Sequence, residues 1–229
     1  MALDYRGKTA LVTGASSGIG VEFAHRLAAR GANLILVARR KDRLQVLAKE
    51  ITAKYGVTVS VIAADLSVDG AAKSLHKQLA RKKTEVDILI NNAGFGTIGE
   101  FATMDEVKIG DQIRLNVLAL VELTREFVPS MKLRNSGVVV NIASTAAYQP
   151  VPYMAVYAAT KAFVLSFTEA LWGELRGTNV HAIALSPGGT KTEFFDVASN
   201  GKTGDGFGKM QTVNQVVETA INALDAVTP

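Results

Sequence analysis

Short apolar runs alternate with longer amphipathic stretches along almost the whole chain, and this alternation restricts the fold more than any other feature. The runs are continuously apolar, which is typical of strands buried on both faces of a parallel sheet. We expect strands at Thr9–Thr13, Leu34–Ala38, Val57–Ala63, Val86–Ile90, Val138–Ile142 and Val180–Leu185. We expect helices at Ile19–Arg30, Asp42–Tyr55, Ala71–Lys82, Asp105–Leu133, Met154–Arg176 and Asn214–Ala226. The pattern predicts an α/β fold, a doubly wound parallel sheet with helices on both faces.

No linker or shift of composition divides this pattern. A length of 229 residues fits one α/β domain or two small ones, and we expect a single domain over residues 1–229. The glycine-rich region 189–212 predicts a mobile substrate loop that contains a short helix at Phe194–Phe195. We also expect a further strand, after residue 229, to complete the sheet.

Composition argues against several classes of function. The net charge of +4 is modest, and Lys and Arg are scattered among acidic residues, so a nucleic-acid partner is not expected. The chain has no Cys, which excludes disulfides and thiolate zinc sites, and its three His residues are widely spaced. We expect no metal site.

Targeting segments are not evident either. The first eight residues lack the apolar centre of a signal peptide, and no apolar run approaches the ~18 residues of a membrane helix. We expect a soluble, cytoplasmic protein without a membrane span.

A glycine-rich turn follows the first expected strand and opens the first expected helix. Its glycines, spaced Gly-x-x-x-Gly-x-Gly, permit a tight turn and let the backbone approach a pyrophosphate at the helix N-terminus. A purely structural turn is the alternative, but the position in the first βα unit favours nucleotide binding. The candidate residues are Gly14, Ser16, Ser17, Gly18, Ile19 and Gly20.

The end of the second expected strand indicates which nucleotide binds. An acidic residue there would bond a ribose 2′-hydroxyl, but the strand is followed by Arg39, Arg40 and Lys41, with no acid before Asp42. Three cations at a helix N-terminus oppose the helix dipole, so an arriving anion would stabilise them. Solvated charges partly offset by Asp42 are the alternative. We predict NADP(H) over NAD(H), with Arg39 as the main 2′-phosphate contact and Arg40 as the second.

Tyr157 and Lys161 lie four residues apart in the expected helix Met154–Arg176, so the ammonium can lie beside the phenol. A free tyrosine titrates near pKa ~10, and a nearby positive charge lowers that pKa. Alone, such a pair is more often a surface tyrosine with a solvated lysine. In this setting it predicts a tyrosine that acts as acid or base.

The motifs occur together and in one order: Thr13–Gly20, Asn91-Asn92-Ala93-Gly94, Ser144, Tyr157, Lys161 and Pro187-Gly188. In this ordered set the chain resembles the short-chain dehydrogenase/reductase family over essentially its whole length. The resemblance implies a Rossmann-type fold and an oxidoreductase that interconverts a carbonyl and a secondary alcohol.

The resemblance also implies four catalytic residues. Ser144 would orient and polarise the substrate carbonyl, and Tyr157 would be the general acid/base. Lys161 would lower the pKa of Tyr157 and contact the nicotinamide ribose. Asn116 would distort the long helix and hold a water that completes a proton relay.

Further cofactor contacts are implied in the same way. Asp65, followed by Leu66, would bond the adenine, although a helix cap explains Asp65 equally well. Asn92, Ala93 and Gly94 would pack against the cofactor. The segment after the sixth strand, with Pro187, Gly188, Thr190 and Thr192, would hold the nicotinamide end.

Apolar residues near the expected catalytic tyrosine favour a lipophilic ketone, a 3-oxoacyl thioester or a steroid. We expect Phe95, Val151 and Phe194 to bind substrate. Further candidates are Ile98, Phe101, Pro152 and Met154, with Phe195 and Phe207 in a lid. An acyl carrier protein or CoA thioester would then be a possible partner.

Two further expectations concern the oligomeric state and the choice between an enzyme and a non-catalytic protein. The helix Met154–Arg176 carries more apolar residues than one buried stripe requires (Phe163, Phe167, Leu171, Trp172 and Leu175), which favours a homodimer or homotetramer. The alternative to an enzyme is an NADP(H)-binding sensor without catalysis, since one fold serves many functions.

Overall fold

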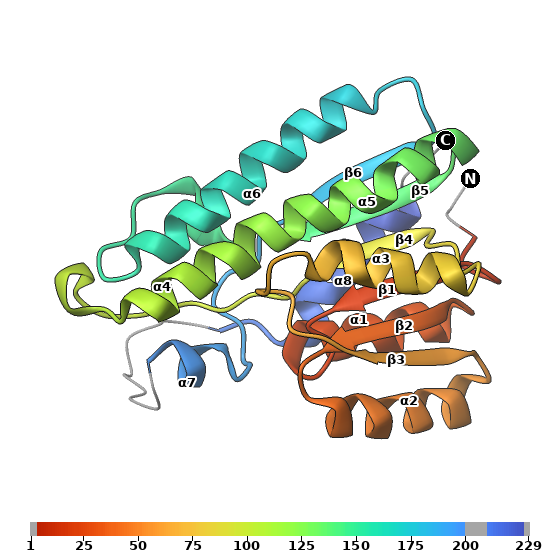
Figure 1. Ribbon diagram of the computed structural model, residues 1–229, viewed down its shortest axis with the longest axis horizontal. Helices are drawn as coiled ribbons and strands as arrows, with labels where there is room; N and C mark the ends of the chain where they lie inside the picture. Colours follow the sequence, from red (N-terminus) through yellow and green to blue (C-terminus); the bar gives the residue numbers. More distant parts are fainter. Residues whose placement is uncertain (1–3, 200–209, 227–229) are drawn as a thin grey trace.

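The computed structural model describes residues 4–199 and 210–226, and these form one six-stranded parallel sheet flanked by helices. The strand order is β3-β2-β1-β4-β5-β6, and neighbouring strands lie side by side in Figure 1. The strands are β1 (Thr9–Thr13), β2 (Asn33–Ala38), β3 (Val59–Ala63), β4 (Ile88–Asn91), β5 (Gly137–Ile142) and β6 (Val180–Leu185). The predicted fold class is confirmed.

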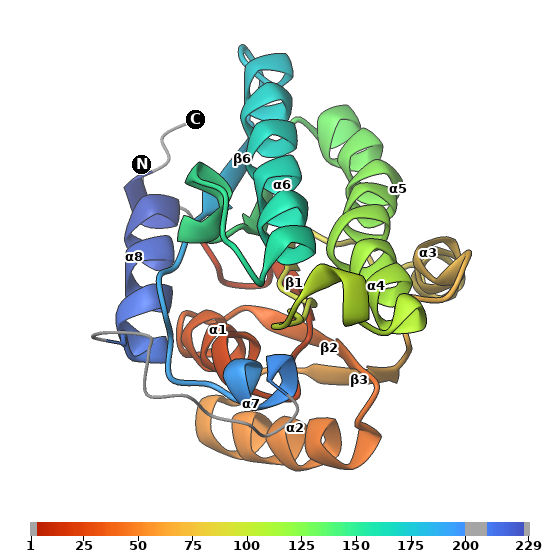
Figure 2. The ribbon, with the colours of Figure 1, turned by 90° about the vertical axis from the view of Figure 1, so that its left-hand side faces the viewer.

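Helices cover both faces of the sheet, as Figure 2 shows. One face carries α1 (Gly18–Ala29), α2 (Lys41–Tyr55) and α8 (Val213–Ala226), and the other carries α3 (Ala71–Arg81), α5 (Ala119–Arg134) and α6 (Ala155–Glu174). Successive strand residues point to opposite faces: Ala10 and Val12 join the first core, and Leu11 joins the second. Both faces are therefore apolar, which explains the continuous apolar runs.

The long helix expected at 105–133 is not one regular helix. It consists of α4 (Glu106–Ile113), a π-helical turn (Arg114–Leu118) and α5. Asn116 lies within the π-helical turn and is buried. Single π turns inside α-helices occur frequently at functional sites, and the interruption is where the resemblance places a distorted helix.

The glycine-rich region is described only in part. The expected short helix is present as α7 (Phe194–Ala198), and Thr190 pairs with Gln211 in an isolated bridge. Phe207 and its neighbours in 200–209 lie outside the described residues. Across the rest of the described chain, no helix combines the length and apolar character that crossing a membrane requires.

The direction of the strands fixes where a ligand can bind. All the strands run parallel, so their carboxyl ends meet at one edge. β1 is bordered by β2 on one side and β4 on the other, and the order of the strands reverses there. Open α/β sheets bind ligands in the crevice at such a reversal.

Candidate active site

A cavity of about 500 Å³ opens at this carboxyl edge, lined by loops that follow all six strands. Nearly every residue that the sequence analysis expects to bind the cofactor lines this cavity. These residues are Gly14, Ser16, Ser17, Gly18, Ile19, Arg39, Arg40, Asp65, Leu66, Asn92, Ala93, Gly94, Tyr157, Lys161, Pro187, Gly188, Thr190 and Thr192. Gly20 is the exception, and it does not line the cavity.

The glycine-rich turn is built so that side chains would not fit. Gly14 and Gly18 have φ angles of +65° and +56°, which L-residues rarely adopt. A Cβ atom at Gly18 would lie 2.9 Å from Cγ2 of Thr192, on the segment across the cleft. Backbone therefore comes close to any ligand at the N-terminus of α1, as a bound pyrophosphate requires.

Gly20 acts behind the turn instead of facing the ligand. A Cβ atom there would lie 2.5 Å from the carbonyl oxygen of Gly14 and 2.7 Å from Nδ2 of Asn92. The glycine thus allows α1 to begin directly against the loops after β1 and β4.

We expect Gly20→Ala to destabilise the protein by about 1–3 kcal/mol and to weaken NADPH binding at least about tenfold, because backbone must move to admit the methyl group. Urea unfolding and a cofactor titration measure the two effects. Gly173→Ala in α6 is the matched control, since nothing lies within 4 Å of its added Cβ, and it should be neutral or stabilising. Equal behaviour of the two variants would contradict this role.

Thr13 joins the loops after β1 and β4, a role that its sequence context did not single out. Its Oγ1 accepts the backbone N–H groups of Asn92 and Ala93 at 2.9 and 3.0 Å and donates to the carbonyl of Ile90 at 3.1 Å. The Asn92 amide donates to the carbonyl of Thr13 at 2.9 Å. The Asn-Asn-Ala-Gly segment is therefore fixed to the glycine-rich turn.

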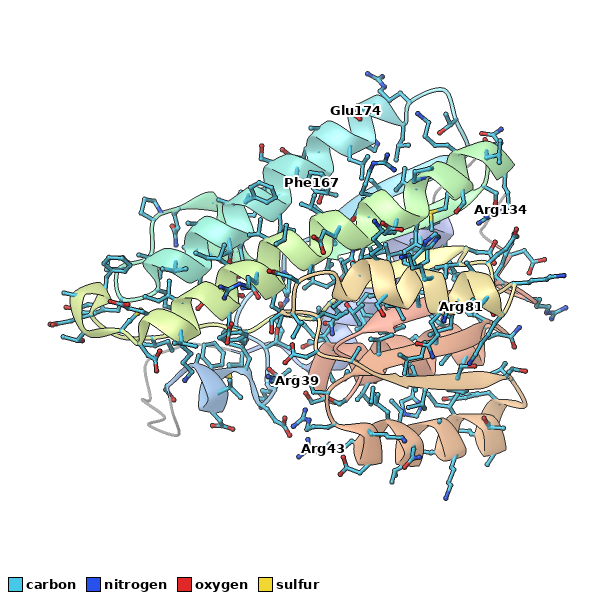
Figure 3. The ribbon with its side chains drawn as sticks, in the orientation of Figure 1. Arg39, Arg43, Arg81, Arg134, Phe167 and Glu174 are labelled. Carbon is cyan, nitrogen blue, oxygen red and sulfur yellow. The ribbon has the colours of Figure 1, made fainter. Side chains whose placement is uncertain are left out.

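Basic residues gather where α2 begins. Arg39 is exposed at the rim, and Figure 3 shows Arg39 and Arg43 at the end of α2 that faces α7. Arg40 donates to Oγ of Ser16 at 3.0 Å and to Oγ of Ser17 at 2.9 Å. These positive and hydroxyl groups suit a phosphate, while the order of importance of Arg39 and Arg40 stays a prediction.

Asp65 turns toward its own chain. Its carboxylate accepts the Ser67 backbone N–H at 2.9 Å and the Ser67 hydroxyl at 2.6 Å. Burial alone would raise the pKa of Asp65, but these bonds and the nearby Arg39 lower it overall. The side chain forms a local turn rather than capping α3, which Gly70 precedes. Contact with an adenine stays a prediction.

Ser144 and Tyr157 meet in the cavity. Ser144 begins the short 3-10 helix Thr145–Tyr148, and its Oγ accepts the Ala146 N–H at 3.1 Å. Burial raises the pKa of Tyr157, and a hydrogen bond with Ser144 offsets part of this rise. The phenol is therefore protonated at neutral pH, the form that donates a proton.

Lys161 is buried beside Tyr157. Its Nζ donates to the carbonyl of Ile142 at 2.6 Å and lies 5.8 Å from the centroid of the Tyr157 ring. Burial lowers the pKa of Lys161 to about 8. Burial outweighs the hydrogen bond with Ser144 and raises the pKa of Tyr157. A lowering of that pKa by Lys161 together with a bound cofactor stays a prediction.

Asn116 lies behind the cavity, not on its lining. Its amide accepts the N–H of Phe95 at 3.0 Å and donates to the carbonyl of Phe95 at 2.9 Å, and it also donates to Oγ1 of Thr160 at 3.2 Å. It thus joins the loop after β4 to the helix that carries the tyrosine. The water relay stays a prediction.

Apolar residues enclose the tyrosine end of the cavity. The rings of Phe194 and Tyr157 have centroids 5.1 Å apart. Gly96 makes room for them, since a Cβ there would lie 2.6 Å from the Phe194 ring. Of the apolar candidates, Phe95, Val151, Met154, Phe194 and Phe195 line the cavity. Phe101 and Pro152 line a separate one of about 350 Å³, and Ile98 bonds the backbone of Ala198.

Glu193, at the start of α7, is a cavity residue that no sequence pattern indicated. Its carboxylate accepts from Arg40 at 2.8 Å and from Arg43 at 2.6 Å. Bonds from Arg43 and Arg40 lower its pKa to about 2. The pairing crosses more than a hundred residues of sequence, so only the fold reveals it.

A model of the short chain dehydrogenase family matches residues 8–202, which include the glycine-rich turn, the tyrosine and the lysine. The chain belongs to this family. The membership confirms the family that the ordered motifs indicated.

Similar proteins carry dehydrogenase and reductase names. A short chain dehydrogenase of Pseudocercospora fijiensis is 40% identical over 190 residues, 82% of this chain and 61% of that protein. A very-long-chain 3-oxoacyl-CoA reductase of Meyerozyma guilliermondii is 37% identical over 186 residues, 76% of this chain and 54% of that protein. This chain therefore spans less than two thirds of the length of these two relatives.

A solved structure matches more completely. The short-chain dehydrogenase from Sphingobium yanoikuyae in complex with NADPH superposes with a TM-score of 0.88 at 36% identity, covering 95% of this chain and 84% of the other. In the present chain, residues 4–199 and 210–226 contain no group of three His, Asp or Glu side chains able to hold a metal ion.

Proposed function

We propose that this short-chain dehydrogenase is an NADP(H)-dependent oxidoreductase that interconverts a carbonyl and a secondary alcohol on a lipophilic substrate. The observation that carries the proposal is one cavity that combines a glycine-rich, basic nucleotide end with a buried, protonated Tyr157 beside Ser144. Neither end alone would specify the reaction.

The nucleotide end fits a dinucleotide phosphate. The turn at Gly14 and Gly18 has no room for a Cβ atom, and Ser16, Ser17 and Arg40 present hydroxyl and guanidinium groups to an anion. NADPH, when bound, supplies the hydride. The solved relative from Sphingobium yanoikuyae, which holds NADPH, supports this choice.

The chain's own residues would handle the proton and the carbonyl. The Tyr157 hydroxyl, held neutral by burial, donates its proton to the developing alkoxide. Ser144 orients the carbonyl oxygen through its hydroxyl. Lys161, buried and bonded to Ile142, provides a positive charge near the ring and fixes this end of α6 against β5. In the oxidative direction the deprotonated, phenolate form of Tyr157 would accept the proton of the alcohol.

Apolar lining by Phe95, Val151 and Phe194 supports a lipophilic substrate over a polar sugar. The 3-oxoacyl-CoA reductase among the relatives supports a 3-oxoacyl thioester within that class. A CoA thioester or an acyl carrier protein would then deliver it.

The proposal is tested by following NADPH oxidation with 3-oxodecanoyl-CoA, a steroid ketone and a bulky aromatic ketone, with a ketose as the polar control. We expect turnover with at least one apolar carbonyl and a preference for NADPH over NADH. Tight NADPH binding with no turnover on any of them would favour the non-catalytic sensor.

The outer face of α6 supports self-association. Phe163 and Trp172 are 44% and 53% exposed, whereas Leu175 is buried in the core. Homodimer or homotetramer formation through the long helices, and the cytoplasmic location, stay predictions. Light scattering coupled to size exclusion measures the first.

A further inference from the structure

The carboxylate of Glu193 shares Arg40 with the glycine-rich turn. Nη1 of Arg40 bonds the carboxylate at 2.8 Å, while its Nε and Nη2 bond Oγ of Ser16 at 3.1 and 3.0 Å, and Nη2 bonds Oγ of Ser17 at 2.9 Å. One guanidinium therefore joins α7 to the turn before α1. Nε, Nη1 and Nη2 of Arg40 therefore already donate to oxygen acceptors.

Ser16, Ser17 and Arg40 are also the groups that suit an adenosine 2′-phosphate. Arginine presents its donors in a rigid planar fork, which matches phosphate and carboxylate geometry equally. The Glu193 carboxylate lines the same cavity and bonds the same fork. A phosphate dianion placed there would meet a second anion competing for one cation.

We infer that Glu193 is a specificity-determining residue whose carboxylate competes with the 2′-phosphate for Arg40 and so reduces the preference for NADP(H) over NAD(H). This inference rests on the proposed function, since it assumes that the cavity holds the cofactor. Arg43, which bonds the other carboxylate oxygen at 2.6 Å, keeps Glu193 in place beside the cavity.

The expected effect of Glu193 on 2′-phosphate affinity depends on how exposed the Arg40–Glu193 ion pair is to solvent. Side chains of Arg40 and Glu193 are 39% and 44% exposed, so solvent screens their interaction, and exposed ion pairs contribute little. The carboxylate stays ionised throughout the neutral range because its pKa is about 2. We expect an effect of about threefold to fivefold on affinity, present at every pH near neutrality.

Calorimetric titration with two small probes isolates this effect from catalysis. Adenosine 2′,5′-bisphosphate carries the 2′-phosphate, and adenosine 5′-monophosphate lacks it. We expect Glu193→Gln, which keeps the shape and removes the charge, to bind the bisphosphate about threefold to fivefold more tightly. Its affinity for the monophosphate should stay within about twofold of wild type.

Glu218→Gln is the matched control. Glu218 pairs with Arg26 at 2.9 Å, is 46% exposed, and lies on α8 outside the cavity lining. It should leave the affinities for both probes unchanged, which separates a local competition from a general loss of negative charge.

The outcomes separate the inference from the proposed function. An unchanged ratio of the two affinities in Glu193→Gln, while wild type prefers the bisphosphate, would overturn the competition alone. No preference in either protein would overturn both the competition and the NADP(H) assignment. A raised ratio with no turnover on any carbonyl would support the competition and count against the oxidoreductase.

Discussion

Replacing Tyr157 with phenylalanine is expected to lower turnover by about 10²–10⁴-fold while leaving NADPH affinity within about twofold of wild type. In the proposed reaction the Tyr157 hydroxyl supplies the proton to the alkoxide, and that interaction develops in the transition state. The ring, which packs against Phe194 with centroids 5.1 Å apart, remains in place. Steady-state turnover and a fluorescence titration with NADPH measure the two quantities.

Tyr148→Phe is the matched control for this variant. Tyr148 is 65% exposed, and its hydroxyl bonds Oγ of Ser186 at 3.2 Å, so the change removes the same group from a nearby site. It should retain most of the turnover. If Tyr157→Phe retained it as well, another residue or water would have to supply the proton.

Lys161→Met is expected to abolish most turnover while stabilising the fold at neutral pH. The pKa of Lys161 falls from an ordinary 10.5 to about 8 on burial, a penalty of roughly 3 kcal/mol on the charged folded state. Methionine removes that penalty but leaves the Ile142 carbonyl without its donor, which costs about 1–2 kcal/mol. We expect a net gain of about 1–2 kcal/mol in the free energy of unfolding.

The pH dependence of this gain has a definite sign. Because the folded-state pKa lies below the unfolded one, the lysine binds protons more strongly in the unfolded chain between about pH 8 and 10.5. The penalty is full below about pH 8 and disappears as the pH rises to 10.5, so the gain shrinks over that window.

Urea unfolding of wild type and variant near pH 7 and again near pH 9.5 tests both statements. Lys49→Met, at an exposed position of α2, should change stability by less than about 0.5 kcal/mol at either pH. If Lys161→Met were less stable than wild type near pH 7, burial of the charged lysine would not carry the expected free-energy penalty.

Local patterns predict the sheet, the glycine-rich turn and the Tyr157–Lys161 pair, because each depends on neighbours in sequence. The family resemblance, and not a local pattern, implies Ser144 and Asn116. The π-helical turn around Asn116 is different, since its buried amide is satisfied by Phe95 and Thr160 on other elements. The pattern of 105–133 alone predicts one unbroken helix, and only the family resemblance indicates a distortion there.

Contacts between distant segments explain the remaining differences. Arg40 and Glu193 are 153 residues apart, so no spacing rule connects them. For Lys161 the i, i+4 spacing correctly places it near Tyr157, but the direction of both pKa shifts follows from burial, which a helical pattern does not specify. The sequence predicts Thr13 only as the end of a strand. Its hydroxyl can bond the loop after β4 only because β1 and β4 are neighbours in the sheet, and the local sequence does not specify that pairing.

Transfer of deuterium tests the central claim most directly. The protein is incubated with NADPH deuterated at the transferred position and with 3-oxodecanoyl-CoA, the steroid ketone or the bulky aromatic ketone, and the product is analysed by mass spectrometry. We predict a secondary alcohol that carries the deuterium on its carbinol carbon, and none with Tyr157→Phe in the same time. Consumption of the cofactor without a deuterated alcohol from any of these carbonyls would contradict the account.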